Sequence, residues 1–250
     1  MSVRSEIVQF IRDQFRDNDN GVAVIGMSGG KDSTITAALC VEALGADRVI
    51  GVRMPCGVQK DGSVSVAVCR ALRMPYGTIN IGEACDELYG QLRDMTEKTG
   101  LPDIVTSNTP ARLRMTSLYM VAGMYPGSRV VNTCNRSEDY VGYSTKYGDA
   151  AGDFSPLGNL TVREVLAIGQ EYIDEGVLKR EWVYKTPDDG MSGLSDEQKL
   201  GFTYDELDGY LLEGKYPSPE KCARISALHV STRHKYKPMP IFNPNEEETV

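Results

Sequence analysis

A glycine-rich turn near the N-terminus follows an apolar run of residues. Residues 22–33 read V-A-V-I-G-M-S-G-G-K-D-S. A strand that ends in such a turn and leads into a helix presents backbone N–H groups and the positive end of the helix dipole to an anion. Ser28 and Ser33 add hydroxyl donors, and Lys31 adds a positive charge. The stretch therefore predicts a phosphate-binding loop.

Asp32 is the unusual member of this loop, because a carboxylate repels a polyphosphate unless a Mg²⁺ ion lies between them. The spacing of the glycines is neither that of a Walker loop, G-x-x-x-x-G-K-[ST], nor G-x-G-x-x-G. These residues predict a site for ATP and Mg²⁺, in a loop shaped for a group other than the usual β- and γ-phosphates. The alternative is a structural glycine turn whose helix is capped by Ser28 and Asp32.

The composition excludes several other classes of site and partner. The chain has 250 residues and a net charge of −8, which argues against general nucleic-acid binding because that depends on Lys and Arg. It has two histidines, His229 and His234, so a His-rich metal centre is excluded. No apolar stretch approaches the roughly 20 residues of a membrane span. We therefore expect neither a nucleic acid nor a membrane as partner.

The cysteines and the N-terminus indicate a cytoplasmic protein. Six cysteines are present and none forms a C-x-x-C pair. Charged residues such as Arg4, Glu6 and Arg12 interrupt the N-terminal segment, which is therefore not a signal peptide. Reduced thiols are the prediction, and disulfides are the alternative.

Hydrophobic periodicity predicts the elements that must position the loop. Strands are expected at 22–25, 48–52, 76–81 and 129–133. Helices are expected at 3–15, 35–44, 63–72, 83–95 and 110–124. Strands that alternate with helices predict an α/β fold, a Rossmann-like parallel sheet with helices on both faces. Ligands of such sheets lie beyond the carboxyl ends of the strands, where the glycine turn and Thr133 are expected.

The C-terminal part lacks strand signals after about residue 150. Helices are predicted at 162–175, 204–213 and 218–230, which makes this part helical. Residues 185–199 are polar and rich in Gly, Ser and Asp, so they predict a long loop that acts as an active-site lid. The acidic tail from Asn243 is expected to fray. Because there is no repeat or linker, residues 1–250 are predicted to form a single domain.

The segment S-G-G-K-D-S at 28–33 resembles the S-G-G-x-D-S loop of the ATP pyrophosphatases. In that superfamily the loop holds the pyrophosphate that leaves when ATP transfers AMP to an acceptor. Its members include GMP synthetase, asparagine synthetase, tRNA-modifying enzymes and NAD synthetase. The resemblance implies an adenine nucleotide α-hydrolase-like fold, but the loop alone does not separate these enzymes.

Four further stretches resemble NAD synthetases, in the same order along the chain. N-T-P-A-R-L-R-M-T-S-L-Y at 108–119 is similar to the A-R-x-R-M helix of that family. The segment at 130–157 is similar to its second signature, G-T-x-x-x-x-E, then G-[FY]-x-T-K-Y-G-D, then an Asp before Pro-Leu. L-G-F-T-Y-D-E-L-D at 200–208 and H-K at 234–235 complete the match. The resemblance covers nearly the whole chain, as a single NAD synthetase domain.

This resemblance implies an ammonia-dependent NAD synthetase, a ligase that forms a C–N bond. ATP would adenylylate the nicotinate carboxylate of deamido-NAD, because a carboxylate has no good leaving group of its own. Ammonia would then displace AMP and leave the amide, NAD. Both steps build negative charge on phosphorus-bound or carbonyl oxygens, so cations and backbone donors must be placed in advance.

The resemblance also assigns roles to particular residues. Asp32 and Glu138 would bind Mg²⁺, although helix capping is the alternative for Glu138. Asp153 would hold ammonium or take its proton, with Asp149 as the local alternative, because ammonia attacks only when deprotonated. Lys146 would take part in catalysis and also meet the substrate. ATP would be bound by Gly26, Met27, Ser28, Gly29, Gly30, Lys31, Asp32, Ser33 and Thr133, and deamido-NAD by Arg112, Lys146, Asp153, His234 and Lys235.

The chain departs from the family pattern at several positions. N-T-C-N at 132–135 replaces the usual G-T-G-N or G-T-D-H, which changes what lines the nucleotide site. The usual basic residue falls at Val162, and a lid hydroxyl falls at Asp188, so neither ATP contact is carried over. Because the loop begins at residue 26, there is no room before it for an amidase domain. Free ammonia is therefore the expected donor, unless a separate glutaminase supplies it.

The family is usually a homodimer with substrate at the interface, and this is also our expectation here. Two other functions stay open from the residues alone. One is another ATP pyrophosphatase, tRNA-modifying or amidating, which would be expected to carry a basic face and often paired cysteines. The other is a non-catalytic adenine-nucleotide sensor, which would keep the loop without needing Glu138, Lys146 and Asp153 together.

Overall fold

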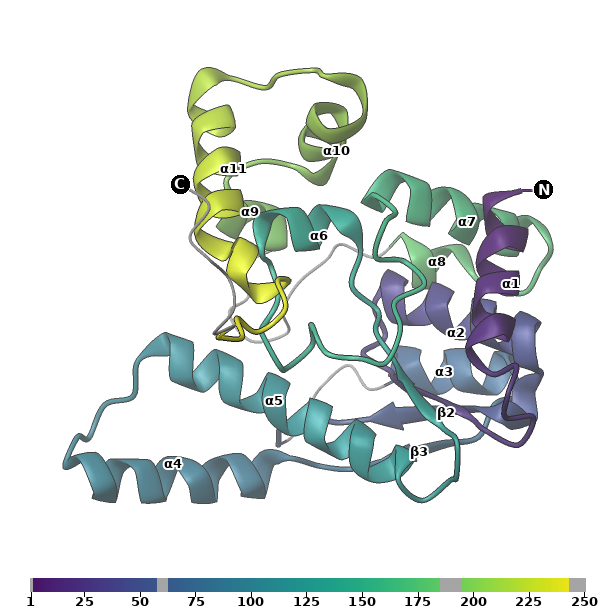
Figure 1. The fold of residues 1–250 in the computed structure, drawn as a ribbon, viewed down its shortest axis with the longest axis horizontal. Coiled ribbons are helices and arrows are strands. Elements are labelled where there is room, and N and C mark those ends of the chain that lie inside the picture. Colours follow the sequence, from purple (N-terminus) through teal and green to yellow (C-terminus); the bar gives the residue numbers. More distant parts are fainter. Residues whose placement is uncertain (1, 58–62, 185–194, 243–250) are drawn as a thin grey trace.

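A four-stranded parallel sheet forms the centre of the fold, in the order β3-β2-β1-β4 (Figure 1). The computed structural model describes residues 2–57, 63–184 and 195–242. The strands are β1 Ala23–Gly26, β2 Val49–Arg53, β3 Tyr76–Thr78 and β4 Arg129–Val131. Each lies within about two residues of its predicted start and end, apart from β3, which ends three residues early at Thr78.

Helices cover both faces of this sheet, which confirms the predicted α/β class. On one face α2 (Lys31–Leu44) packs against α1 (Val3–Gln14), α7 (Val162–Asp174) and α8 (Arg180–Val183). α3 (Ser63–Ala71) completes the apolar core of that face. On the other face α5 (Asp103–Ala122) packs against β1 and β4. Strands buried on both sides explain why β1 is an unbroken apolar run.

β1 pairs with β2 on one side and with β4 on the other, so the chain leaves β1 toward one side of the sheet while β4 lies on the opposite side. β1 leads through α2 to β2 on one side, and β4 lies on the other side of β1. The segments that follow their carboxyl ends therefore lie at the position in the sheet where α/β proteins bind ligands. This topology brings the glycine turn after β1 next to the segment 132–138 after β4.

Helix α5 begins at Asp103, so the predicted start at residue 110 is wrong. A start at residue 110 would place Pro110 at the first helical position, where the missing N–H of a proline costs nothing. In the structure Pro110 lies inside the helix. Its missing N–H would leave the carbonyl of Thr106 without a partner, and the hydroxyl of Tyr89 donates to that carbonyl at 3.2 Å. Tyr89 lies in α4 (Gly82–Thr96), which packs against α5.

The C-terminal part is helical, as expected, and has an apolar cluster of its own. The cluster joins α7 to four helices: α6 (Arg136–Val141), α9 (Asp196–Leu200), α10 (Tyr204–Glu213) and α11 (Pro219–Thr232). Two short 3₁₀ helices, η1 (Ala46–Arg48) and η2 (Arg233–Lys235), complete the described elements. Whether residues 1–250 form one domain stays a prediction.

Part of the predicted loop at 185–199 is helical instead. Ser195 and Gln198 form a capping box that starts α9, a sequence signal that we missed. Helices α6 and α8 were also not predicted, because each is too short to show periodicity. The remainder of the loop, with Asp188, and the tail from Asn243 lie outside the described residues.

The six cysteines are all free thiols. Burial raises the pKa of the Cys69 thiol to about 11. Among the described residues, no helix is both long and apolar enough to cross a membrane.

Candidate active site

The glycine turn after β1 is held open by its backbone conformation. The N–H of Met27 still bonds to the sheet, at 2.9 Å from the carbonyl of Val52. Gly29 then adopts φ +83°, which L-residues rarely do. A Cβ built on Gly29 would lie 3.4 Å from the backbone nitrogen of Ser65. This glycine is therefore required by the backbone, whatever binds in the loop.

The start of α2 is left without a side-chain cap. Its N-cap residue is Gly30, and no side chain accepts a hydrogen bond there. The alternative, capping by Ser28 and Asp32, is not what forms. The hydroxyl of Ser28 instead accepts from the N–H of Gly30 at 3.2 Å and lies 3.0 Å from the hydroxyl of Ser33. The first-turn N–H groups of α2 thus remain available to an anion.

The absence of a side chain at Gly30 is expected to matter for ligand binding rather than for folding. Its φ is −83°, and a Cβ would meet only the hydroxyl of Ser28, at 3.4 Å. We predict that Gly30→Ala weakens ATP binding at least about tenfold, measured by calorimetry, with little change in the melting temperature. Gly29→Ala is the contrasting variant and should cost about 1–2 kcal/mol of stability. Equal destabilisation by both substitutions would contradict this division of roles.

A pair of carboxylates faces a lysine beside this loop. Lys31 Nζ lies 2.8 Å from Asp32 Oδ2 and 3.8 Å from Glu138 Oε1. Asn135 joins the two acids: its Nδ2 donates to Asp32 Oδ1 at 3.1 Å, and its Oδ1 accepts from the N–H of Glu138 at 3.0 Å. The structure therefore brings Asp32 and Glu138 together, as predicted. Asn135 was not predicted as a site residue, although an Asn three positions before an acid is a capping signal.

The electrostatics of this pair favour a bound cation. Burial, and then the charge of Asp32, raises the pKa of Glu138 to about 8, against the lowering effect of Lys31. Burial lowers the pKa of Lys31, but Asp32 and Glu138 together raise it above its ordinary value. Glu138 therefore holds its proton more readily than an ordinary carboxyl group, and a cation bound beside it would favour the ionised form.

These residues fit Mg²⁺ better than a metal held by protein ligands alone. Mg²⁺ takes oxygen ligands and is usually held by one or two carboxylates, with substrate phosphates and water as the others. Within the described ranges no group of three or more His, Cys, Asp or Glu side chains forms a metal site. Asp32 and Glu138 form such an incomplete set of ligands, beside a glycine turn that is expected to hold phosphate.

Tyr204 closes the site from the C-terminal helices. It lies at the start of α10, and Lys31 Nζ is 5.6 Å from the centre of its ring. Its hydroxyl is buried and has no hydrogen-bond partner among the described residues. A buried hydroxyl without a partner is costly, so the hydroxyl of Tyr204 is a candidate to donate to a bound ligand. Tyr204 was not predicted, because the local pattern does not show which way it points.

The predicted substrate residues gather around one turn of the chain. Arg112 Nε donates to the carbonyl of Lys146 at 3.3 Å. Lys146 Nζ donates to the carbonyl of His234 at 3.1 Å. Lys235 Nζ donates to two backbone carbonyls just before Lys146, at 2.6 and 2.7 Å. Residues from three distant parts of the sequence thus meet within a single chain.

Asp153 lies at the edge of the sheet. Its Oδ2 accepts from the N–H of Val130 at 2.7 Å, and its Oδ1 accepts from the hydroxyl of Tyr119 at 3.2 Å. The side chain is fixed but exposed. Asp149, the alternative proton acceptor, uses Oδ1 to accept from the N–H of Thr145 at 2.9 Å and so closes the turn that carries Lys146.

The departure at 132–134 has a structural explanation. Asn132 Nδ2 donates to the carbonyls of Asp149 and Ala151, at 2.9 and 3.2 Å. The thiol of Cys134 also donates to the carbonyl of Asp149, at 3.3 Å. These two side chains tie the segment with Lys146 and Asp153 to the end of β4. Thr133, between them, is half-buried at the carboxyl end of β4, where a nucleotide contact was expected.

No basic side chain replaces the family residue at Val162. Val162 is buried, and its N–H donates to the hydroxyl of Ser137 at 3.1 Å. Arg163 is committed to ion pairs with Asp205, at 2.8 Å, and with Glu213. Val162 thus offers no charged group to a nucleotide, and the guanidinium of Arg163 is already paired with two acids.

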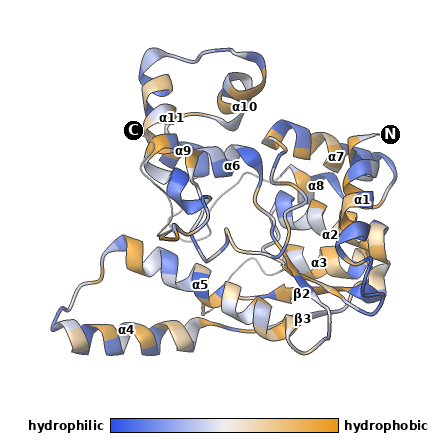
Figure 2. Cartoon of the chain, in the orientation of Figure 1, coloured by the Kyte–Doolittle hydropathy of each residue, from blue (hydrophilic) through white to orange (hydrophobic). Residues whose placement is uncertain are grey.

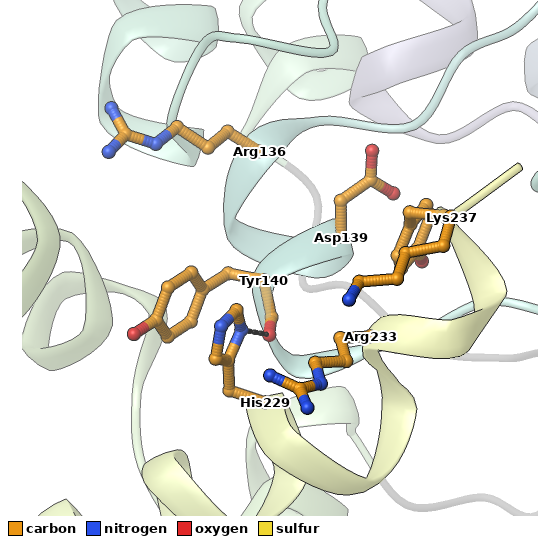
Figure 3. Close-up of a pocket in the computed structure, with 7 residues that line it drawn as sticks. Arg136, Asp139, Tyr140, His229, Arg233 and Lys237 are labelled. Carbon is orange, nitrogen blue, oxygen red and sulfur yellow. Dashed lines mark hydrogen bonds between the residues drawn. The ribbon is translucent and has the colours of Figure 1, made fainter. Parts of the chain in front are cut away.

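A pocket of about 460 Å³ lies between α6, α11 and η2, and its residues were not predicted (Figure 3). Tyr140 and His229 stack along one side, with ring centres 4.1 Å apart. Asp139 lies on the other side, and one of its oxygens is buried without a partner in the described part of the chain. The lining residues are Arg136, Asp139, Tyr140, His229, Arg233, Tyr236 and Lys237. The three cations among them suit a phosphate.

Comparison with known proteins identifies the family of this chain. The family model described as NAD synthase matches residues 3–239. The NH(3)-dependent NAD(+) synthetase of Methanocaldococcus jannaschii is 38% identical over 237 residues, 91% of this chain and 87% of that protein. That of Nocardia farcinica is 35% identical over 240 residues, 91% of this chain and 85% of that protein. A solved structure described as NMN synthetase from Francisella tularensis is 31% identical, with a TM-score of 0.85 and 98% of both chains covered.

The family match spans the glycine turn, the carboxylate pair and the Lys146 turn together. On the sequence and on the arrangement of these residues, the chain belongs to the NAD synthase family.

Proposed function

We propose that this protein is an ammonia-dependent ligase that converts deamido-NAD to NAD, with ATP cleaved to AMP and pyrophosphate. The observation that carries the proposal is the meeting of a phosphate loop with Asp32 and Glu138 in a chain that belongs to this family. Curated relatives that are 35–38% identical over most of their length bear the name NH(3)-dependent NAD(+) synthetase. The cytoplasmic location that the sequence predicts is also part of this proposal.

The reaction would proceed in two steps at adjacent places. The nicotinate carboxylate attacks the α-phosphorus of ATP and releases pyrophosphate, which the loop at 26–33 holds through its N–H groups. Ammonia then attacks the activated carbonyl and releases AMP. Mg²⁺, when bound to Asp32 and Glu138, supplies positive charge for the phosphate oxygens. Arg112, Lys146 and the segment with His234 and Lys235 would orient the dinucleotide, whose pyrophosphate needs cations.

The same arrangement also suits a smaller substrate. The structure from Francisella tularensis is described as an NMN synthetase, and this chain and that one cover 98% of each other. A second candidate function is therefore the amidation of nicotinic acid mononucleotide to NMN. The two substrates share the nicotinate and its ribose phosphate, and they differ in the AMP half.

One experiment tests both candidates. Purified protein is incubated with ATP, Mg²⁺ and ammonium, and either deamido-NAD or nicotinic acid mononucleotide is the acceptor. Pyrophosphate release and the amide product are measured. Ammonium-dependent NAD with the higher kcat/KM supports the first function, and a higher kcat/KM for the mononucleotide supports the second. Tight ATP binding without turnover of either acid would support the nucleotide-sensor alternative. An amide formed only with glutamine and a second protein would replace free ammonia as the donor.

Homodimer formation is the second part of the proposal. α4 and α5 extend from the sheet as an arm, and apolar residues lie along it (Figures 1 and 2). The large exposed apolar side chains on, between and directly after these helices are Leu88, Met95, Ile104, Tyr119, Met120, Met124 and Tyr125. Apolar surface gathered on one projecting element is typical of an interface. A second copy of this chain would cover it.

The double substitution Met120→Glu and Met124→Glu should convert the dimer to a monomer. Charges on a buried apolar interface cost far more than the same charges in water. Light scattering after size-exclusion chromatography should show about half the mass of the unmodified protein. Met239→Glu, at an exposed methionine outside the arm, is the control and should leave the mass unchanged. A monomeric unmodified protein would contradict the proposal.

A further inference from the structure

The side chain of Lys31 points at the acids and not along the loop. Its ammonium is 2.8 Å from Asp32 Oδ2 and 3.8 Å from Glu138 Oε1, and the side chain is 5% exposed. These are the two carboxylates that the proposed function, on which this inference rests, assigns to Mg²⁺. A positive charge that belongs to the protein thus already lies beside both carboxylates proposed to bind the metal.

The surroundings keep this ammonium in place. The ring of Tyr204 lies over it, with the ring centre 5.6 Å from Nζ. Each carboxylate oxygen of Asp32 already accepts one hydrogen bond, Oδ2 from Lys31 and Oδ1 from Asn135. A metal ion that approaches Asp32 must therefore share an oxygen with Lys31 or Asn135, or displace one of these two hydrogen bonds. It must also tolerate a like charge within a few ångströms, at a site with little water to screen it.

We propose that Lys31 is a built-in counter-ion that competes with divalent metal for Asp32 and Glu138. The pair then takes up a metal only together with the polyphosphate. A nucleotide removes the obstacle in two ways. Its phosphate oxygens give Lys31 another anion to pair with, and they supply ligands that two carboxylates alone do not provide. Metal and ATP therefore bind together. When both are absent, Lys31 remains paired with Asp32 and Glu138.

Mn²⁺ binding to the nucleotide-free protein tests the competition. Mn²⁺ accepts the same oxygen ligands as Mg²⁺, and the free ion is counted by electron paramagnetic resonance. Lys31→Met should create a nucleotide-independent Mn²⁺ site at least about tenfold tighter than in the unmodified protein, which corresponds to about 1.4 kcal/mol. Lys31→Arg keeps the charge and should keep Mn²⁺ out. The double variant Lys31→Met with Asp32→Asn should lose the new site.

The matched control is Lys179→Met, which removes the same charge from an exposed lysine near α8. It should leave Mn²⁺ binding unchanged. Circular dichroism establishes that each variant is folded, and Lys31→Gln replaces Lys31→Met if the latter is not. Two results would overturn the proposal: tight Mn²⁺ binding to the nucleotide-free unmodified protein, or a folded Lys31→Met variant without any gain.

This test is separate from the test of the proposed function. It uses neither deamido-NAD nor ammonia, and its readout is bound metal rather than turnover. If the amidation assay fails and Lys31→Met still gains the Mn²⁺ site, then the competition stands and the assigned reaction falls. If amidation succeeds and Lys31→Met gains no site, then only the role of Lys31 falls.

Discussion

Replacing Asp32 with Asn is expected to lower kcat for pyrophosphate release by about 10²–10³-fold, the usual loss when one preorganised charge is removed from a reacting centre. The carboxylate is fixed by Lys31 at 2.8 Å and by Asn135 at 3.1 Å, so it is already positioned before any ligand arrives. Asn retains the shape but presents an N–H₂ group to one of these two donors. The site then loses a negative ligand and also gains a clash of donors.

The measurement is pyrophosphate release over a range of Mg²⁺ concentrations. The Asp32→Asn variant should need a higher Mg²⁺ concentration for its half-maximal rate, because one of the two carboxylates proposed to bind Mg²⁺ has lost its charge. Asp103→Asn is the matched control, since Asp103 also lies in the first turn of a helix and interacts with its dipole in the same way. It should retain full activity. An Asp32→Asn variant with unchanged kcat would exclude the carboxylate from the reaction.

Replacing Asp153 with Asn is expected to lower kcat/KM for ammonium by about 10²-fold, the lower end of what a positioned proton acceptor contributes. An ionised carboxylate offers about four lone-pair positions. Two of them accept from the N–H of Val130 and the hydroxyl of Tyr119. Because the side chain is exposed, the remaining positions are open to a donor such as ammonium.

Tyr119→Phe separates this chemical role from a structural one. It removes one hydrogen bond to Asp153 but leaves the charge, so it should change kcat/KM for ammonium by less than about fivefold. The rate is measured against ammonium concentration, and thermal unfolding is followed for both variants. If Asp153 only secured the edge of β4, Asp153→Asn would lower the melting temperature and leave the dependence on ammonium unchanged.

Helix α6 links the two parts of the candidate site. Glu138 on this helix faces Lys31, whereas Arg136, Asp139 and Tyr140 line the cationic pocket (Figure 3). The position of α6 is fixed by Ser137, whose hydroxyl donates to buried Asp208 at 2.5 Å. A ligand in the pocket would therefore contact the same short helix that carries one of the two acids.

The sequence alone was sufficient for the sheet and for the loop, because both rest on local patterns. Apolar runs of four to six residues between turns indicate buried strands. A glycine turn between a strand and a helix indicates an anion site, and the structure adds the φ of +83° that makes Gly29 necessary. The order of the family motifs then indicated which distant residues would meet. Lys146 and His234, 88 positions apart, do meet.

Local patterns failed where a short or interrupted element depends on contacts far along the chain. Helix α5 continues through Pro110 because Tyr89, on another helix, satisfies the carbonyl that the proline leaves free. Helix α6 has six residues, fewer than periodicity can detect. Its start is secured by Asn135, whose side chain also reaches Asp32 across 103 positions of sequence.

The sequence by itself determined the class of fold and the position of the glycine turn, and its resemblance to the family singled out the two acids, Asp32 and Glu138, that lie together beside this turn. The sequence predicted that Lys31 contacts a phosphate group of ATP. Only the tertiary structure decided the direction in which its side chain points. The ammonium of Lys31 lies close to the carboxyl groups of Asp32 and Glu138. These two acids become adjacent only because β1 and β4 lie side by side in the sheet. The packing of α10 then seals that arrangement with the ring of Tyr204.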